Sequence, residues 1–183
     1  MAAAVLRSRV SELGLDVTVS SAGFLFDGRR AEPDAVEQLQ RLGLDLRGHR
    51  ARTLDPSILA GAGLVLTMEL RHVRDVVLMD EAAFARTFTL PELVERGEDA
   101  GPRAPDEELP AWLARVGAGR SRTDLLRNRP EWEVEDPMNR SRRVFRRCGD
   151  QLVDLVDRFV ALAWPGEVPG GQHALSNPTP RSS

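Results

Sequence analysis

The sequence predicts an α/β domain in which helices cover a parallel sheet. Two observations lead to this prediction. Segments with the apolar spacing of helices alternate along the chain with short apolar or β-branched runs, and 183 residues suffice for one domain with a single core. Because open parallel sheets bind ligands at the carboxyl ends of their strands, functional residues are expected after Val19, Thr67 and Leu90, where the predicted strands end.

The first predicted elements are a helix, a strand and a second helix. Apolar residues at helical spacing predict a helix over residues 2–13, which Gly14 ends. Residues 15–20 alternate between apolar and polar side chains, a pattern typical of a strand with one face in water or at a sheet edge. Pro33 begins the next predicted helix, which Gly43 ends.

The central part of the chain contains two further predicted strands. Residues 64–67 are nearly all apolar, which indicates a strand buried on both faces. Residues 69–79 return to helical spacing, and residues 86–90 form a second, weaker strand pattern. A stretch rich in Pro, Gly and acidic residues, 97–110, is expected to be a loop before a short helix around Trp112.

The last predicted helix is the longest. It covers residues 140–163, has one apolar stripe and ends before Pro165. The following residues are rich in Pro, Gly and Ser, a composition that does not support a packed core. We therefore expect one domain over residues 1–164 and a flexible tail over 165–183.

Composition and charge exclude several classes of protein. The formal net charge is −3 and the pI about 5.7, so a general nucleic-acid binder is not expected. No apolar run reaches the roughly 18–20 residues of a membrane span. The first residues lack the layout of a signal peptide, so we expect a cytoplasmic protein. All 25 basic residues are arginine. Because they are spread out and mostly flanked by acids, we attribute this bias to codon usage rather than to anion binding.

Cysteine and histidine usage argues against a metal centre. Cys148 is the only cysteine, so it forms neither an internal disulfide nor a Cys-based zinc site. It lies on the apolar stripe of the last helix, which predicts an inert core thiol. The three histidines lie on different elements without ligand spacing. We expect His49 to be structural, His72 to be solvated and His173 to lie in the tail, with no metal and no cofactor bound.

The densest positive cluster lies at the start of the last predicted helix. It can be a solvated helix face, or it can bind an acidic partner or a phosphopeptide. Its members are Arg140, Arg142, Arg143, Arg146 and Arg147.

Four short segments stand in a fixed order along the chain. They are Ser20-Ser-Ala-Gly23, Gly43-Leu-Asp-Leu-Arg-Gly-His-Arg-Ala-Arg-Thr-Leu54, Leu64-Val-Leu-Thr-Met68 and Val134-Glu-Asp-Pro-Met138. In this order and spacing, from Met1 to about Ala163, the chain resembles the low-molecular-weight protein-tyrosine-phosphatase family, whose relatives include thioredoxin-coupled arsenate reductases. The resemblance implies a three-layer α/β sandwich with a short parallel sheet flanked by helices. It also implies hydrolysis of phosphate monoesters, in phosphorylated proteins or aryl phosphates, through a phosphocysteine.

The family pattern also contains a part that this sequence lacks. In the family a first strand leads into a phosphate-binding loop, Cys-x5-Arg-Ser/Thr, and the pattern continues as Pro-Met-Ala-x-Ala-Leu-Leu-Arg. This chain begins Met1-Ala-Ala-Ala-Val-Leu-Arg7, and Asp154 stands six residues after Cys148. The resemblance places the missing strand between residues 15–20 and 64–67. We therefore expect a start codon set too far downstream and a truncated, inactive chain.

Asp136 is the catalytic position that does match the family. By resemblance it is the general acid, which protonates the leaving oxygen and later helps water attack the phosphocysteine. The family has an aromatic residue and then glycines after Asp-Pro, whereas Met138, Asn139 and Arg140 stand here, and the chain has no tyrosine. Two alternatives remain open: a non-catalytic phosphatase-like binding module, and an arsenate-reductase relative, an activity that needs further cysteines.

Overall fold

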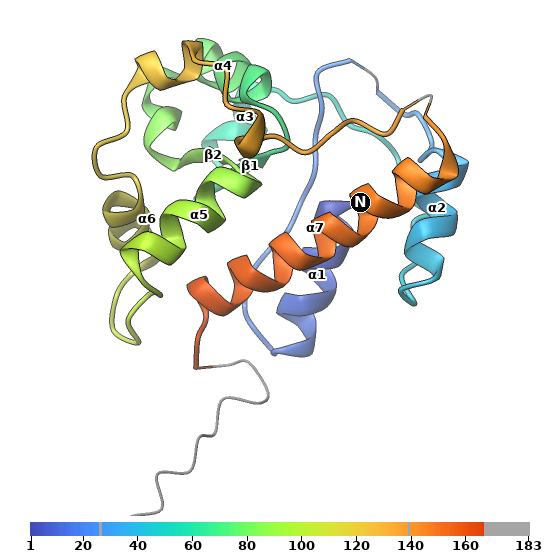
Figure 1. Cartoon of the computed structure of the whole chain (residues 1–183), viewed down its shortest axis with the longest axis horizontal. Coiled ribbons are helices and arrows are strands. Elements are labelled where there is room, and N and C mark those ends of the chain that lie inside the picture. Colours follow the sequence, from blue (N-terminus) through green and yellow to red (C-terminus); the bar gives the residue numbers. More distant parts are fainter. Residues whose placement is uncertain (26, 139, 167–183) are drawn as a thin grey trace, which may run out of the picture.

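A short parallel sheet lies among helices, and this confirms the predicted α/β class. The computed structural model describes residues 1–166 except 26 and 139, so the predicted tail over 165–183 lies almost wholly outside the described residues. The sheet consists of β1 (Val65–Thr67) and β2 (Thr87–Thr89), paired in parallel with Leu66 opposite Phe88. Helices surround this pair of strands, and the longest helix runs diagonally across the molecule (Figure 1).

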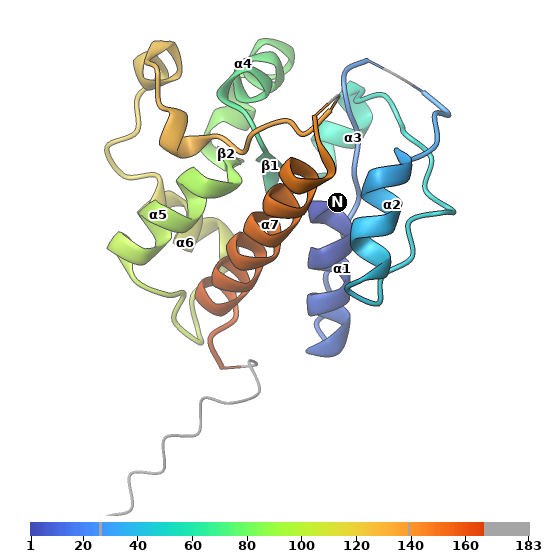
Figure 2. The ribbon, with the colours of Figure 1, turned by 45° about the vertical axis from the view of Figure 1, so that its right-hand side comes forward.

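One side of the molecule is built from three helices. α1 (Ala2–Glu12) and α2 (Pro33–Gln40) both pack against α7 (Arg142–Ala163), as Figure 2 shows. At Gly149 of α7 a Cβ atom would lie 2.6 Å from the Gln38 side chain, so α2 approaches α7 closely only because a glycine stands there. All three helices were expected from their apolar spacing.

The other side contains helices α4 (Leu70–Met79), α5 (Leu90–Ala100) and α6 (Leu109–Val116). α5 was not predicted, and its last turn occupies part of the expected loop 97–110. The reason is local: the hydroxyl of Thr89, the last residue of β2, accepts a hydrogen bond from the Glu92 N–H. The strand therefore passes into the helix without a loop residue between them.

Four short helical segments were also not predicted. They are the α-helix α3 (Pro56–Ala60) and the 3₁₀ helices η1 (Glu81–Arg86), η2 (Arg122–Leu126) and η3 (Pro130–Trp132).

The more deeply buried of the two strands is not the one for which the sequence predicted burial on both faces. Residues 64–67 were expected to be buried on both faces, but Val65 and Leu66 are only half-buried. The weaker pattern gave β2, in which all three residues are buried. The reason is tertiary: α4 and α5 both pack against β2, whereas β1 pairs with β2 along one edge only within the described residues.

The predicted strand over residues 15–20 does not form. Its alternation persists as burial, because Leu15, Val17 and Val19 are half-buried and the residues between them are exposed. Among the described residues, however, no strand pairs with this segment. A strand needs a neighbour for its N–H and C=O groups, and alternation alone does not supply one.

A buried ion pair joins β2 to the helices that cover it. Arg120 and Glu92 have only 4% and 2% of their side chains exposed, and the Arg120 Nε lies 2.7 Å from the Glu92 carboxylate. Arg120 also donates hydrogen bonds to the Phe84 and Thr87 carbonyls and stacks on the Phe88 ring at 3.9 Å. One guanidinium therefore holds η1, β2 and α5 together.

We expect Arg120→Met to lower the free energy of unfolding by about 3 kcal/mol, the low end of the cost of breaking a buried pair. The value is at the low end because Arg96 still lies 3.2 Å from the Glu92 carboxylate. Urea denaturation measures it. Arg158→Met, which removes exposed pairs with Glu98 and Asp154, should cost less than about 1 kcal/mol. Equal losses in the two variants would contradict the special role of Arg120.

Hydrogen exchange tests the unpaired state of residues 15–20. The backbone N–H groups of Thr18, Val19 and Ser20 have no backbone acceptor among the described residues. We expect them to exchange on the order of 100 times faster than the amides of β2, because protection follows hydrogen bonding and burial. Protection equal to that of β2 would show that the segment is a paired strand after all.

Candidate functional site

The chain after Trp132 is fastened to the carboxyl end of β1. The Val134 N–H donates a hydrogen bond of 2.9 Å to the Met68 carbonyl, directly after the strand. The Glu133 carboxylate accepts one of 3.1 Å from the Leu70 N–H, at the start of α4. A carboxylate at a helix N-terminus is favourable in the field of the helix dipole. The following residues therefore begin where parallel sheets place their sites.

Asp136 lies in this fastened segment and is exposed. Its Oδ1 accepts a hydrogen bond of 3.0 Å from the Met138 N–H, which forms an Asx turn around Pro137. Proline fixes its own φ, so the turn holds the carboxylate in one direction. This geometry suits a residue that must transfer a proton at one place.

Arg71, in the first turn of α4, faces the same region. It pairs with Glu69 at 2.7 Å. The pKa of Arg71 is raised, first by its hydrogen bond to Glu69 and, among smaller causes, by the charge of Asp136. An exposed guanidinium therefore lies within electrostatic reach of the Asp136 carboxylate. Sequence reasoning missed it, because nothing local distinguishes Arg71 from other arginines on helix faces.

The segment after residue 20 reaches the same edge of the molecule. The ring of Phe24 stacks on His72 of α4, with 5.3 Å between ring centroids. His72 is half-buried, so the prediction that it is solvated was wrong. Gly23 also pairs with residue 53, and its N–H donates to the Arg52 carbonyl at 2.8 Å.

His49 is half-buried. Its pKa is lowered, first by burial and then by the positive charges of the amino terminus, Arg7 and Arg50. Those positive charges also disfavour a bound cation. In the described part of the chain, no three His, Cys, Asp or Glu side chains gather as metal ligands would.

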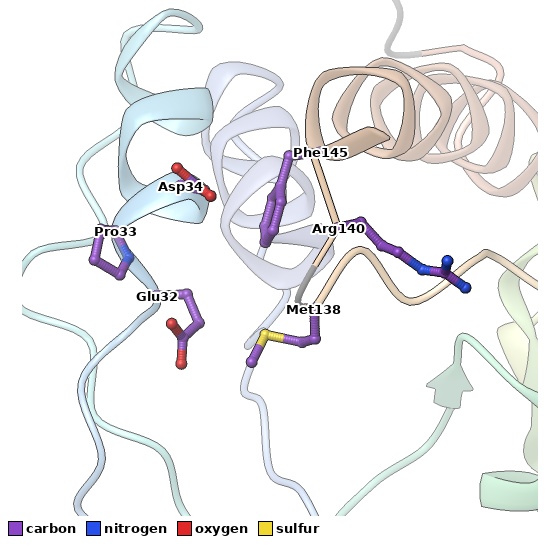
Figure 3. Close-up of a pocket in the computed structure, with 6 residues that line it drawn as sticks. All are labelled: Glu32, Pro33, Asp34, Met138, Arg140 and Phe145. Atoms are coloured by element: carbon purple, nitrogen blue, oxygen red, sulfur yellow. The ribbon is translucent and has the colours of Figure 1, made fainter. Parts of the chain in front are cut away.

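A shallow pocket lies beside the Asp136 turn. Its volume is about 200 Å³, and it opens between the start of α2 and the start of α7 (Figure 3). The residues that line it are Glu32, Pro33, Asp34, Met138, Arg140 and Phe145. The sequence predicted both helix starts but not that they would meet, because about 100 residues separate them.

Cys148 occupies the core, as its place on the apolar stripe predicted. Its side chain is 1% exposed, and its Sγ donates a hydrogen bond of 3.3 Å to the Glu135 carbonyl. The pKa of the thiol is raised, first by burial and then by the negative charge of Glu135. A raised pKa keeps the sulfur protonated, and the protonated thiol is a poor nucleophile. The thiol therefore fixes the Asp136 segment on α7 rather than serving chemistry.

Comparisons with known proteins agree with this architecture. Residues 1–106 match the family model described as low molecular weight phosphotyrosine protein phosphatase. The chain is 33% identical over 94 residues to the probable low molecular weight protein-tyrosine-phosphatase EpsP of Ralstonia nicotianae. That alignment covers 51% of this chain and 62% of the relative, so it spans less than two thirds of that protein.

Solved structures resemble a larger part of the chain. The low molecular weight protein tyrosine phosphatase from T. tengcongensis has a TM-score of 0.64 and 26% identity, over 87% of this chain and 86% of that one. The YwlE arginine phosphatase from Geobacillus stearothermophilus has a TM-score of 0.60 and 25% identity, over 86% and 79%. The family match ends before Asp136, so the role of this residue depends on the geometry.

We expect Cys148 to react with iodoacetamide on the order of 100 times more slowly in the folded chain than in urea, because its sulfur is buried and protonated. Mass spectrometry of the alkylated chain measures the rate. Reaction in the folded state as fast as that of a free thiol would show that the sulfur is accessible and ionised.

Proposed function

Since the chain belongs to the low molecular weight phosphotyrosine protein phosphatase family, we propose that it supplies the general acid, but not the nucleophile, of a site that hydrolyses phosphate monoesters. In this proposal Asp136 is the general acid, and the substrate is a phosphorylated protein or an aryl phosphate. The 183 residues are inactive by themselves, because Cys148, their only cysteine, is not a nucleophile. The cytoplasmic location stays a prediction from sequence; no described helix is long and apolar enough to cross a membrane.

The geometry of Asp136 is the observation that supports its role. Its carboxylate is exposed, held by the turn to Met138 and fastened next to the carboxyl end of β1. A carboxylic acid in such a place protonates the leaving oxygen as the phosphorus–oxygen bond breaks. The resulting carboxylate then accepts a proton from the water that attacks the phosphorylated nucleophile.

The surroundings of Cys148 support the proposed inactivity. A phosphate-attacking thiolate needs a lowered pKa and free N–H donors around the phosphate. Cys148 lies inside α7, where backbone N–H groups are used within the helix, and its nearest acceptor is a carbonyl. The sequence also has no Cys-x5-Arg loop to supply a nucleophile and a phosphate-binding arginine together.

The buried thiol equally favours the second candidate function, a phosphatase-like module that binds a phosphorylated partner without turnover. The third candidate, an arsenate-reductase relative, has less support, since that chemistry shuttles electrons among several cysteines and this chain has one.

We expect the purified 183-residue chain to hydrolyse p-nitrophenyl phosphate no faster than buffer, because no activated nucleophile is present. Release of p-nitrophenolate, followed by absorbance, is the measurement, and Cys148→Ser is the control. Turnover that disappears in Cys148→Ser would refute the proposed inactivity.

A chain supplied with a nucleophile tests the acid. We expect activity when a strand and a Cys-x5-Arg loop of the family pattern are fused ahead of Met1. In that fusion Asp136→Asn should lower kcat by roughly 10²–10⁴, the usual contribution of a positioned acid. The control is Asp106→Asn, an exposed carboxylate in the loop before α6, which should change kcat less than about twofold. If the fusion is active and Asp136→Asn leaves its kcat unchanged, Asp136 only forms the turn and is not the general acid.

A further inference from the structure

The arginines at the start of α7 differ from the others in the molecule. Most of the described arginines pair with a carboxylate or donate a hydrogen bond to a backbone or amide oxygen. Among the described residues, the side chains of four arginines do neither and stack on no ring. They are Arg30, Arg140, Arg143 and Arg146. Three of the four therefore lie within seven consecutive positions.

Their neighbours in the sequence show that carboxylates are within reach of this surface but already used. Arg142 lies 3.3 Å from Glu37 and 3.7 Å from Asp34, both on α2. Arg147 pairs with Glu135. Arg140 is exposed, and its guanidinium points away from Glu32 and Asp34 of the pocket (Figure 3). The unpaired positive charge is therefore concentrated at the start of α7, in the exposed residues Arg140, Arg143 and Arg146.

This placement is unfavourable for the helix itself. The first turn of α7 contains no acidic residue, and its N-cap, Ser141, makes no side-chain hydrogen bond to the backbone. A helix N-terminus carries partial positive charge, so arginines such as Arg143 in the first turn repel it. A bound anion would remove this repulsion, whereas water only screens it.

The surface also lies beside the proposed site. Arg140 follows Asp136 by four residues and lines the same pocket as Phe145 of α7. From Ser141 to Arg146 a helix rises about 7–8 Å, which is the length of two to three residues of an extended chain. Successive side chains of an extended chain point to opposite sides, so such a segment next to a phosphorylated residue could place two carboxylates, from alternate residues, on these arginines.

We propose that Arg140, Arg143 and Arg146 bind an acidic segment of a protein substrate, close in sequence to its phosphorylated residue. Each guanidinium offers a planar pair of donors that matches a carboxylate. That the acidic segment belongs to a substrate rests on the proposed function. Its binding to the arginines does not, because binding requires no nucleophile.

Fluorescence anisotropy with two labelled peptides tests the binding. One peptide contains four consecutive glutamates, and the other has glutamines in their place. We expect the full 183-residue chain to bind the glutamate peptide only, and Arg140→Gln/Arg143→Gln/Arg146→Gln to weaken that binding about tenfold, since several exposed charge pairs are lost together. Raising the salt from 50 to 300 mM should weaken it as well.

The matched control removes the same charge elsewhere. Arg122→Gln/Arg127→Gln/Arg129→Gln alters exposed arginines in and beside η2, at the other end of the molecule (Figure 1). It should weaken binding less than twofold. Equal losses in both triple variants would mean attraction by net charge and overturn the proposal. So would no binding of the glutamate peptide, or tighter binding of an eight-nucleotide RNA.

A single charge reversal, Arg143→Glu, tests the proposal even if the triple variant does not fold. It should weaken peptide binding at least threefold without lowering the midpoint of thermal unfolding, because the Arg143 side chain makes no contact that holds the fold and a glutamate is favourable in the first turn of a helix. Binding that is insensitive to this reversal would also overturn the proposal.

Turnover by the loop-bearing fusion then separates the two proposals. There the triple variant should raise KM about tenfold for a phosphopeptide with neighbouring glutamates, and the double variant Arg143→Gln/Arg146→Gln, which spares the pocket, should leave kcat for p-nitrophenyl phosphate unchanged. A fusion without activity, together with specific peptide binding by the 183-residue chain, would count against the proposed hydrolase site alone. An unchanged KM for the phosphopeptide would overturn the substrate role of the arginines.

Discussion

The buried pair of Arg120 and Glu92 is the interaction on which the position of the sheet depends. A guanidinium and a carboxylate removed from water are tolerated only when nearly all their hydrogen-bonding groups are used, and here the same guanidinium also binds the Phe84 and Thr87 carbonyls. These contacts hold β2, and β2 is the partner of β1. The end of β1 in turn holds Val134, two residues before Asp136. The exposed acid thus owes its place to a pair of charges in the core.

A second constraint comes from α7, which connects the two sides of the molecule. α1 and α2 pack on one side of it and α5 on the other. Its buried face also contains Cys148, whose hydrogen bond to the Glu135 carbonyl attaches the segment before Asp136 to α7. This thiol contributes packing and one hydrogen bond. A catalytic thiolate, by contrast, would have to be exposed and surrounded by hydrogen-bond donors.

The surface around the Asp136 turn combines groups of different kinds. Asp136 is exposed and held by a turn, the charge of Arg71 on α4 is within its electrostatic reach, and the unpaired arginines continue from Arg140 along α7. The pocket between α2 and α7 borders the same loop. An exposed carboxylate beside arginines without carboxylate partners is the arrangement from which both proposals start, and residues 1–106 match the phosphatase family.

Local sequence patterns predicted the helices with strong apolar spacing, the two strands that pair, the core position of Cys148 and the turn at Asp136. These features depend on local patterns, which the chain carries wherever it folds. Tertiary structure decided the rest. Residues 15–20 have the alternation of a strand but no neighbour to pair with, and β2 is buried because α4 and α5 cover it. His72 stacks on Phe24, and Glu32 and Phe145 line one pocket, although long stretches of chain separate the members of each pair. Periodicity specifies which face of an element is apolar, whereas the partner of that face is chosen only when the whole core packs at once.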